Sequence, residues 1–349
     1  MNKEVKRNIN IDIIKVFALF LVATMHFFLT GYYELTYEKR TIPFIAIRNF
    51  SAICVPLFIM TTGYLLANKT WSKKYYLSVL STFFMYITAT TICGLFDMKF
   101  IITWRNFLKI LENIVAFEYY GWYMNMYFGL VLIAPAINII YKNFSTRNQK
   151  KLMLLHLFFL ISIPVTLLDI FSTTGHQVIS HILPTWWKGM YPIVYYTLGL
   201  YIKEYGESFK KKNLTILFWV TIIISTLAYY IANLQWETTT YPSIFLVIMA
   251  SITFIKLINL DIKLKPQIEK IVIFISTNTL SAYLLSWIID TLIMRPIIKG
   301  WTENLQLRLY LLPTVLLSFT LTIIATFIFK TIYDRSINVG VKKLIKKLT

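Results

Sequence analysis

The stretch that decides the fold is Ile9–Gly31, which reads INIDIIKVFALFLVATMHFFLTG. A helix of this length, at 1.5 Å per residue, crosses a hydrocarbon core of roughly 30 Å. The stretch is too long for the apolar region of a signal peptide, and it has no small-residue cleavage site. We therefore predict a retained transmembrane helix.

Apolar stretches of similar length recur along the whole chain. Of the 349 residues, 57% are hydrophobic and only 15% are charged, and a soluble domain could not solvate so much apolar surface. We predict an all-α, polytopic membrane helix bundle of about ten transmembrane helices, with residues 1–349 as a single domain. The predicted spans are 9–31, 43–67, 75–95, 122–141, 152–170, 189–203, 214–233, 241–259, 271–293 and 308–333.

Basic residues set the predicted orientation. The net charge is +19, and most Lys and Arg side chains fall on one side of the spans, including Lys210–Lys212 and the set from Lys330 to Lys347. By the positive-inside rule this side is cytoplasmic, and it holds both termini. Because the charges lie in joints between spans and not on one soluble face, nucleic acid is not an expected partner. On the outer side, residues 100–118 have the pattern of an amphipathic interfacial helix.

Cysteine usage and overall composition give two further expectations. Cys54 and Cys93 both lie in apolar segments, so we predict core side chains and neither a disulfide framework nor a metal site. The high Lys, Ile and Asn content is typical of an AT-rich bacterial genome of Gram-positive type. We expect a multi-pass protein of the bacterial cell membrane.

Ionisable residues at bilayer depth are costly and are candidates for function. The first helix carries Asp12, Lys15 and His26. Asp12 and Lys15 share a face near the cytoplasmic end, where they can neutralise each other as an ion pair. His26 lies three turns beyond Lys15 on the same face, roughly 16 Å further through the membrane. It is a candidate general base, and a structural hydrogen-bonding role is the alternative.

Arg48 in the second helix is expected at a depth similar to that of His26, because each lies about five residues below the outer surface. An Arg beside the imidazole would keep it neutral, as a general base requires. Snorkelling of Arg48 to the surface is the alternative.

The outer rim carries the remaining candidates for catalysis and substrate binding. The acids and histidines predicted there are Glu118, Asp169, His176, His181, Glu237 and Asp290, and any of them could orient His26. Glu118 is preferred because an acid within an aromatic rim suits a sugar ring, and the rim includes Tyr119, Tyr120, Trp122 and Tyr123. His176 and His181 lack the spacing and carboxylate context of a metal site, so no metal is expected.

Three segments resemble the acyltransferase-3 family of membrane acyltransferases, in particular members that O-acetylate cell-surface polysaccharides. NINIDIIKVFALFLVATMHFF (8–28) is similar to a family pattern in which an Asp is followed by an Arg or Lys, then by ten residues and a His. Asp12, Lys15 and His26 occupy these positions. VPLFIMTTGYLLANK (55–69) resembles its VPLFF-x-x-SGY-LL segment, and YYGWYMNMYFGLVLIAPAI (119–137) resembles its WYL…LY…P helix. The family's Arg-x-x-Arg motif is replaced by Lys73 and Lys74, and Ser286 stands where many members have a late His.

The resemblance implies acetyl-CoA as the acyl donor, and Lys15, Lys73 and Lys74 could hold its phosphates. His26 would deprotonate an acceptor hydroxyl, and Arg48 would stabilise the oxyanion. The expected acceptor is a cell-surface glycan or a lipid-linked sugar that enters the site from outside, and membrane lipid is a further expected partner. Whether two chains form a homodimer is left open. The alternative function is a transporter or flippase for a glycolipid or small solute, which would not consume acyl-CoA.

Overall fold

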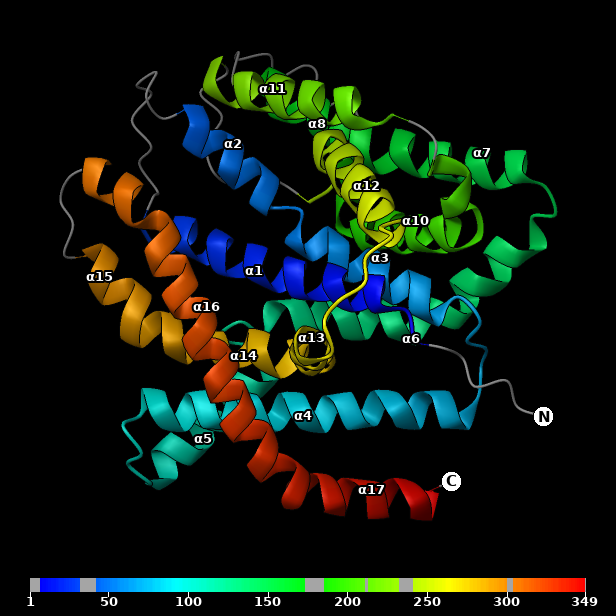
Figure 1. The fold of residues 1–349 in the computed structure, drawn as a ribbon. Helices are drawn as coiled ribbons and strands as arrows, with labels where there is room; N and C mark the ends of the chain where they lie inside the picture. The colour runs from blue at the N-terminus through cyan, green and yellow to red at the C-terminus, as the bar shows by residue number, and fades with distance from the viewer. Residues whose placement is uncertain are drawn as a thin grey trace. The chain divides into compact units, whose positions relative to one another are not determined.

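A computed structural model describes residues 7–31, 42–172, 185–210, 213–231, 241–299 and 304–348, and these are almost entirely helical (Figure 1). No strand occurs within these ranges. This confirms an all-α polytopic membrane protein.

Seven helical segments of the described chain are long and apolar enough to cross a membrane. They are Ile9–Thr30, Ile42–Leu66, Lys73–Asp97, Trp122–Asn143, Arg147–Leu168, Thr279–Ile298 and Leu309–Arg335. The predicted spans 214–233 and 241–259 coincide with two shorter apolar helices, and 189–203 coincides with α10 (Tyr191–Tyr205), a helix of 15 residues. At 1.5 Å per residue α10 is shorter than a hydrocarbon core of roughly 30 Å.

The helices divide into two compact units, and α1 (Ile9–Gly31) contributes residues to both. The first unit comprises Met1–Met25, Tyr33–Ala67 and Phe144–Thr277. Besides α1, its elements are α2 (Ile42–Ser51), α3 (Cys54–Leu66), α7 (Arg147–Leu157), η2 (Phe158–Ser162), α8 (Ile163–Ser172), η3 (Thr185–Met190), α10, η4 (Gly206–Phe209), α11 (Thr215–Ile231), α12 (Ile244–Ile258) and α13 (Pro266–Thr277).

The second unit comprises His26–Tyr32, Asn68–Asn143 and Asn278–Thr349. Besides the end of α1, it contains α4 (Lys73–Asp97), α5 (Trp104–Val115), α6 (Trp122–Asn143), α14 (Thr279–Ile289), η6 (Asp290–Met294), α15 (Arg295–Lys299), α16 (Asn304–Arg335) and α17 (Ile337–Leu348). The predicted span 271–293 is wrong at its start, because helix α13 ends at Thr277 and α14 begins at Thr279 in the other unit.

Close packing of α3 against α10 explains a glycine of the second motif. A Cβ atom at Gly63 would clash with the carbonyl oxygen of Tyr196, and one at Gly199 would clash with that of Met60. Small residues let two helix backbones approach closely, which is a common way to pack helices in lipid. The Gly of the TTGYLL segment is therefore required by packing within the first unit.

The structure confirms the predicted amphipathic helix and the predicted burial of both cysteines. The amphipathic helix expected within 100–118 is α5, which buries Ile110 and Asn113 and leaves Trp104 and Phe107 exposed. Cys54 and Cys93 are free, buried side chains, as predicted for core positions.

Candidate functional site

His26 lies in the last turns of α1, within the second unit, and its side chain is buried. Its Nδ1 atom is 2.8 Å from Oδ2 of Asp290, a residue 264 positions later in the chain. The exposed fractions of the two side chains are 8% and 1%. A buried carboxylate needs hydrogen-bond donors to offset its desolvation, so loss of the contact with His26 would leave Asp290 with a large free-energy cost.

Asp290 is held by two further donors. The Tyr120 hydroxyl donates to Oδ2 at 2.9 Å, and the Ser318 hydroxyl of α16 donates to Oδ1 at 2.8 Å. Asp290 is the first residue of η6, a π-helical turn between α14 and α15. Single π-helical turns within α-helices occur frequently at functional sites, because they turn a side chain away from the regular helical face.

A tight turn before α6 places Tyr120. Phe117 and Tyr119 have positive φ angles of 55° and 57°, which for residues other than glycine cost about 1–3 kcal/mol each. A Cβ atom at Gly121 would lie 2.6 Å from the carbonyl oxygen of Phe117, so the turn requires glycine there. Backbone strain of this kind persists where surrounding contacts over-determine the conformation, and here it brings Tyr120 to Asp290.

Aromatic rings line the histidine. The Tyr120 ring centroid is 4.1 Å from that of His26, and the Tyr283 centroid is 6.3 Å away. Tyr123 packs edge-on against Tyr283, with centroids 5.5 Å apart. The imidazole therefore lies among aromatic faces, in a setting of low polarity apart from Asp290 and its donors.

Tyr120 remains a donor over a wide pH range. Burial raises the pKa of its phenol well above the ordinary value, and the negative charge of Asp290 raises it further. The guanidinium of Arg295 faces the same hydroxyl and partly opposes this rise in the pKa. Arg295 also lies over Trp287, with its Cζ atom 5.7 Å from a ring centroid.

The hydrogen-bond pattern determines what His26 can do. Because the carboxylate of Asp290 only accepts, Nδ1 carries the proton, and the lone pair of the neutral imidazole is on Nε2. An adjacent carboxylate also stabilises the imidazolium that forms when Nε2 takes a proton. A base oriented by a third group is the arrangement found in acid–base and acyl-transfer sites.

Among the predicted rim acids, the structure pairs His26 with Asp290. Glu118 is exposed in the turn before α6, and its catalytic role stays a prediction. Arg48 is buried in α2 of the first unit, with its Cζ atom 5.7 Å from the Tyr229 ring centroid. Since Arg48 and His26 belong to different units, their predicted proximity also stays a prediction.

At the start of α1, Asp12 has a partner that the sequence analysis did not name. Arg7 donates to both carboxylate oxygens of Asp12 at 2.7 Å, and the Ser276 hydroxyl donates to Oδ1. The hydrogen bond to Asp12 raises the pKa of Arg7. Lys15 is half-buried and interacts with Asp12 through charge. The predicted neutralisation of Asp12 is therefore shared with Arg7.

Lys73 and Lys74 are exposed in the first turn of α4, where the Ser72 side chain caps the helix by accepting from the Tyr75 amide. Free amides and the helix dipole favour an anion at such an N-terminus. Two lysines at this position are suited to phosphate groups, and their role in donor binding stays a prediction.

The predicted aromatic rim lies in the same unit as His26. Tyr119 accepts from Asn113 at 2.7 Å, and its ring centroid is 4.4 Å from that of Trp287. Burial and nearby Asp97 raise the pKa of Tyr119 to about 12. Trp122 is exposed, and its centroid is 6.1 Å from that of Tyr123.

The structure does not describe four remaining candidates. His176, His181 and Glu237 lie outside the described residues, as does the side chain of Asp169. Among the residues described, no group of three or more His, Cys, Asp or Glu side chains could hold a metal ion. Ser286 donates to the Tyr283 carbonyl of its own helix at 2.7 Å.

Sequence reasoning placed Tyr120 only in the aromatic rim, missed Ser318 as a site residue and did not rank Asp290 above the other rim acids. A signal for Asp290 is present, because it follows one turn after Ser286 in the late apolar helix. Ser318 lies within a long apolar span, and hydroxyls are common there as satisfied helix residues. Its role becomes visible only from the contact.

A family model described as an acyltransferase domain matches residues 8–326, nearly the whole chain. Comparison with curated proteins and with solved structures found no match. The matched range includes α1, the turn before α6, η6 and Ser318, and therefore every residue of the His26 and Asp290 site.

Proposed function

Because this chain belongs to the acyltransferase-3 family and is therefore a membrane acyltransferase, we propose that it acetylates a hydroxyl of an extracytoplasmic cell-surface glycan, with cytoplasmic acetyl-CoA as donor. The observation that carries the proposal is the hydrogen bond of 2.8 Å between His26 Nδ1 and Asp290, which leaves Nε2 as a general base. A membrane enzyme of this kind would join a donor from one side to an acceptor from the other.

In the proposed reaction, Nε2 of His26 removes the proton of the acceptor hydroxyl as its oxygen attacks the thioester carbonyl. The tetrahedral intermediate then collapses, the carbon–sulfur bond breaks, and the thiolate of coenzyme A takes the proton from the imidazolium. The products are an acetyl ester and free coenzyme A. Asp290 stabilises the imidazolium between these two steps, and Tyr120 and Ser318 keep the carboxylate in place.

The oxyanion needs a positive charge or hydrogen-bond donors. Arg48 is the candidate from the sequence. Arg295 is a second candidate, supported by its position facing the Tyr120 hydroxyl of the same unit. Loss of either cation should lower kcat more than it changes KM, because the oxyanion forms only in the transition state.

For the donor, we propose that Lys73 and Lys74 bind the phosphates of acetyl-CoA at the N-terminus of α4. We also propose Lys15, on the basis of the sequence, as a third ligand of the phosphates. For the acceptor, Glu118 and the rim of Tyr119, Trp122 and Tyr123 are proposed to bind the sugar, which aromatic faces and one acid would recognise. A lipid-linked sugar would present the same chemistry as a glycan. We further propose a bacterial cell-membrane location, of Gram-positive type.

The test measures thiol release from acetyl-CoA by the purified full-length chain in nanodiscs, with and without cell-surface glycan. Wild type should release thiol only when an acceptor is present, and His26→Ala should abolish release while the protein stays folded. Release by His26→Ala at the wild-type rate would refute the role of His26. Failure of wild type to bind or cleave acetyl-CoA would favour the transporter alternative instead.

A further inference from the structure

A cavity of about 350 Å³ lies among membrane-spanning helices of the second unit, and none of the residues that line it belongs to the His26 site. Its lining is almost entirely apolar and includes Ile92 of α4, Leu285 and Ile288 of α14, and Ile328 and Phe329 of α16. We propose that this cavity binds one alkyl chain of an anionic membrane phospholipid, whose headgroup lies where α16 meets α17.

The size and lining of the cavity suit an alkyl chain. At roughly 30 Å³ for a group the size of a water molecule, the volume of about 350 Å³ has room for roughly twelve chain carbons. A sugar or nucleotide would leave its hydroxyls without partners against such a wall, at a cost of about 1–3 kcal/mol for each buried polar group. All three helices belong to segments that are long and apolar enough to cross a membrane, so the surrounding bilayer is the source of an alkyl chain.

Tyr333, near the C-terminal end of α16, brings a buried polar group to the cavity wall. Tyr333 lines the cavity and is only 2% exposed, yet its hydroxyl has no hydrogen-bond partner among the described residues. A buried hydroxyl without a partner is costly, and a lipid ester or phosphate oxygen would accept its proton. The Lys330 ammonium lies 5.2 Å from the Tyr333 ring centroid and pairs with Asp334 at 2.9 Å.

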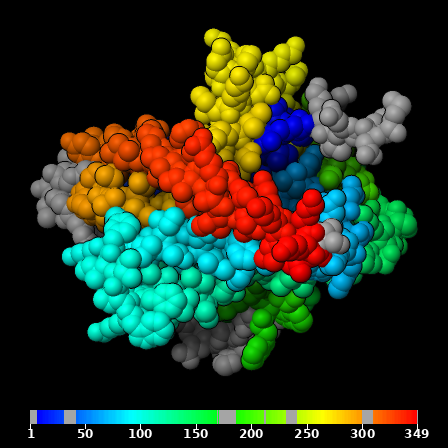
Figure 2. Space-filling model, turned by 90° about the horizontal axis from the view of Figure 1, so that it is seen from below, coloured from blue at the N-terminus to red at the C-terminus, as the bar shows by residue number. Residues whose placement is uncertain are grey.

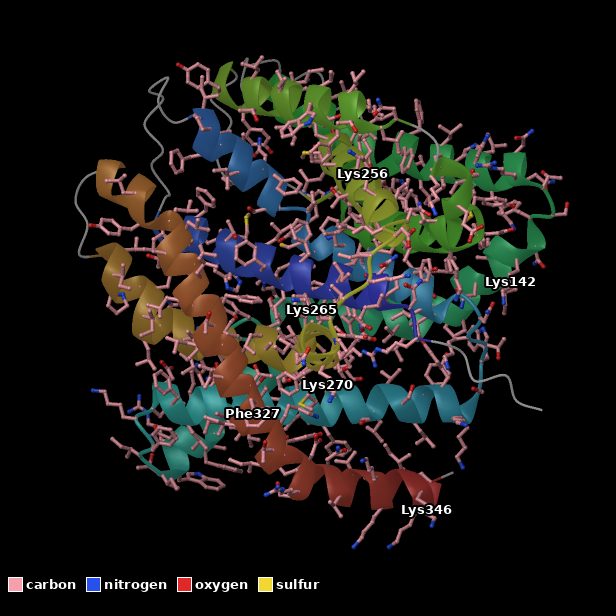
Figure 3. All side chains as sticks on the ribbon, in the orientation of Figure 1. Lys142, Lys256, Lys265, Lys270, Phe327 and Lys346 are labelled. Atoms are coloured by element: carbon pink, nitrogen blue, oxygen red, sulfur yellow. The ribbon has the colours of Figure 1, made fainter. Side chains whose placement is uncertain are left out.

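The next element supplies positive charge. Helix α17 carries Lys342, Lys343, Lys346 and Lys347, all exposed, and buries Val341. It packs on α4, and the space-filling view shows the red and orange segments of α16 and α17 lying across cyan α4 (Figure 2). The stick view shows the side chain of Lys346 extending away from α17 (Figure 3).

The combination of features selects an anionic phospholipid. A neutral lipid could fill the apolar cavity but would gain nothing from α17. Clusters of four or more Lys or Arg beside a membrane-spanning helix attract anionic lipid headgroups at the cytoplasmic surface. The predicted orientation places the end of α16 and all of α17 on that side. Lipid binding at this cavity does not depend on acyl transfer, so a failure of the proposed function would leave it unaffected.

The test is photolabelling of the full-length chain in nanodiscs. Phosphatidylglycerol and phosphatidylcholine, each with a photoactivatable group in one acyl chain, are compared, and mass spectrometry maps the labelled residues. We expect phosphatidylglycerol to label residues of the α16 wall of the cavity in preference to phosphatidylcholine. Replacing Lys342 and Lys343 by Gln should lower that labelling about fivefold for each lysine removed.

A pair of variants on α16 separates the cavity from the outer surface of the helix. Ala325→Trp fills the cavity, because Ala325 lines it, and should abolish labelling of its walls. Phe327→Trp is the control, because Phe327 is 60% exposed and is not among the lining residues; Figure 3 labels its position on α16. Labelling of the walls by Phe327→Trp should equal that of wild type.

Two results would overturn the proposal. Equal labelling of the wild-type cavity by both lipids would mean that bulk bilayer lipid fills it without headgroup selection. Unchanged labelling in a folded Ala325→Trp variant would place the chain elsewhere. If that variant does not fold, competition on wild type decides: unlabelled phosphatidylglycerol must displace the label, and equal displacement by phosphatidylcholine refutes the proposal.

Discussion

Replacing Asp290 by Asn removes the negative charge beside His26 and leaves the volume of the side chain almost unchanged. The amide oxygen of Asn can occupy the Oδ2 position and accept from His26 and Tyr120, while its NH₂ group donates to Ser318. In that arrangement the tautomer of His26 is preserved, and only the counter-charge of the imidazolium is lost. If the amide turns the other way, Nδ1 meets a donor and the tautomer with Nε2 as base is disfavoured.

Both arrangements lower kcat. Loss of general-base function costs about 10²–10⁴-fold, and an Asp→Asn change in a serine-protease triad costs about 10⁴-fold. We expect kcat for acetyl transfer to fall by about 10²–10⁴-fold, which corresponds to roughly 3–5 kcal/mol of transition-state stabilisation. The KM for acetyl-CoA should change little, because Asp290 acts on the base and not on the donor.

The assay follows thiol release from acetyl-CoA by the purified variant in nanodiscs. Asp261→Asn is the matched control, since Asp261 is exposed in a loop of the first unit and the change removes the same charge. Thermal unfolding shows whether each variant is folded. Asp290→Asn activity within threefold of wild type, in a folded protein, would refute the role of the pair.

Three further predictions address the turn, the helix packing and the donor site. Tyr120→Phe removes a donor to the carboxylate of Asp290 and should lower kcat by about tenfold. Because folding raises the pKa of the Tyr120 phenol, the free energy of unfolding of wild type should fall as the pH rises above about 10. In an alkaline unfolding series, the free energy of unfolding of the variant should fall less. Gly63→Ala forces α3 from α10 and should lower the free energy of unfolding by about 1–3 kcal/mol, whereas a Tm equal to wild type would contradict the packing argument. Replacing Lys73 and Lys74 by Gln should raise the KM for acetyl-CoA by about tenfold or more with little change in kcat. Lys142→Gln, on the same predicted side, should leave that KM unchanged.

The sequence by itself determined the class of protein, most of the spans, the family and His26 as the candidate base. These features are local: a run of apolar residues long enough for the bilayer is visible in composition, and a histidine inside it is conspicuous because burial of ionisable groups is costly. The Asp, Lys and His positions of the first helix could be matched to a family without knowing what surrounds them.

Only the tertiary structure decided which partner each buried charge has. Several rim acids satisfied the sequence criteria, and the pairing of Asp290 with His26 depends on which helices pack around the end of α1. The π-helical turn at Asp290 and the strained turn before Tyr120 have no periodic signature, since each is stabilised by contacts with distant segments. A hydrogen bond that joins residues 264 positions apart is a property of packing, and hydrophobic patterns do not encode it.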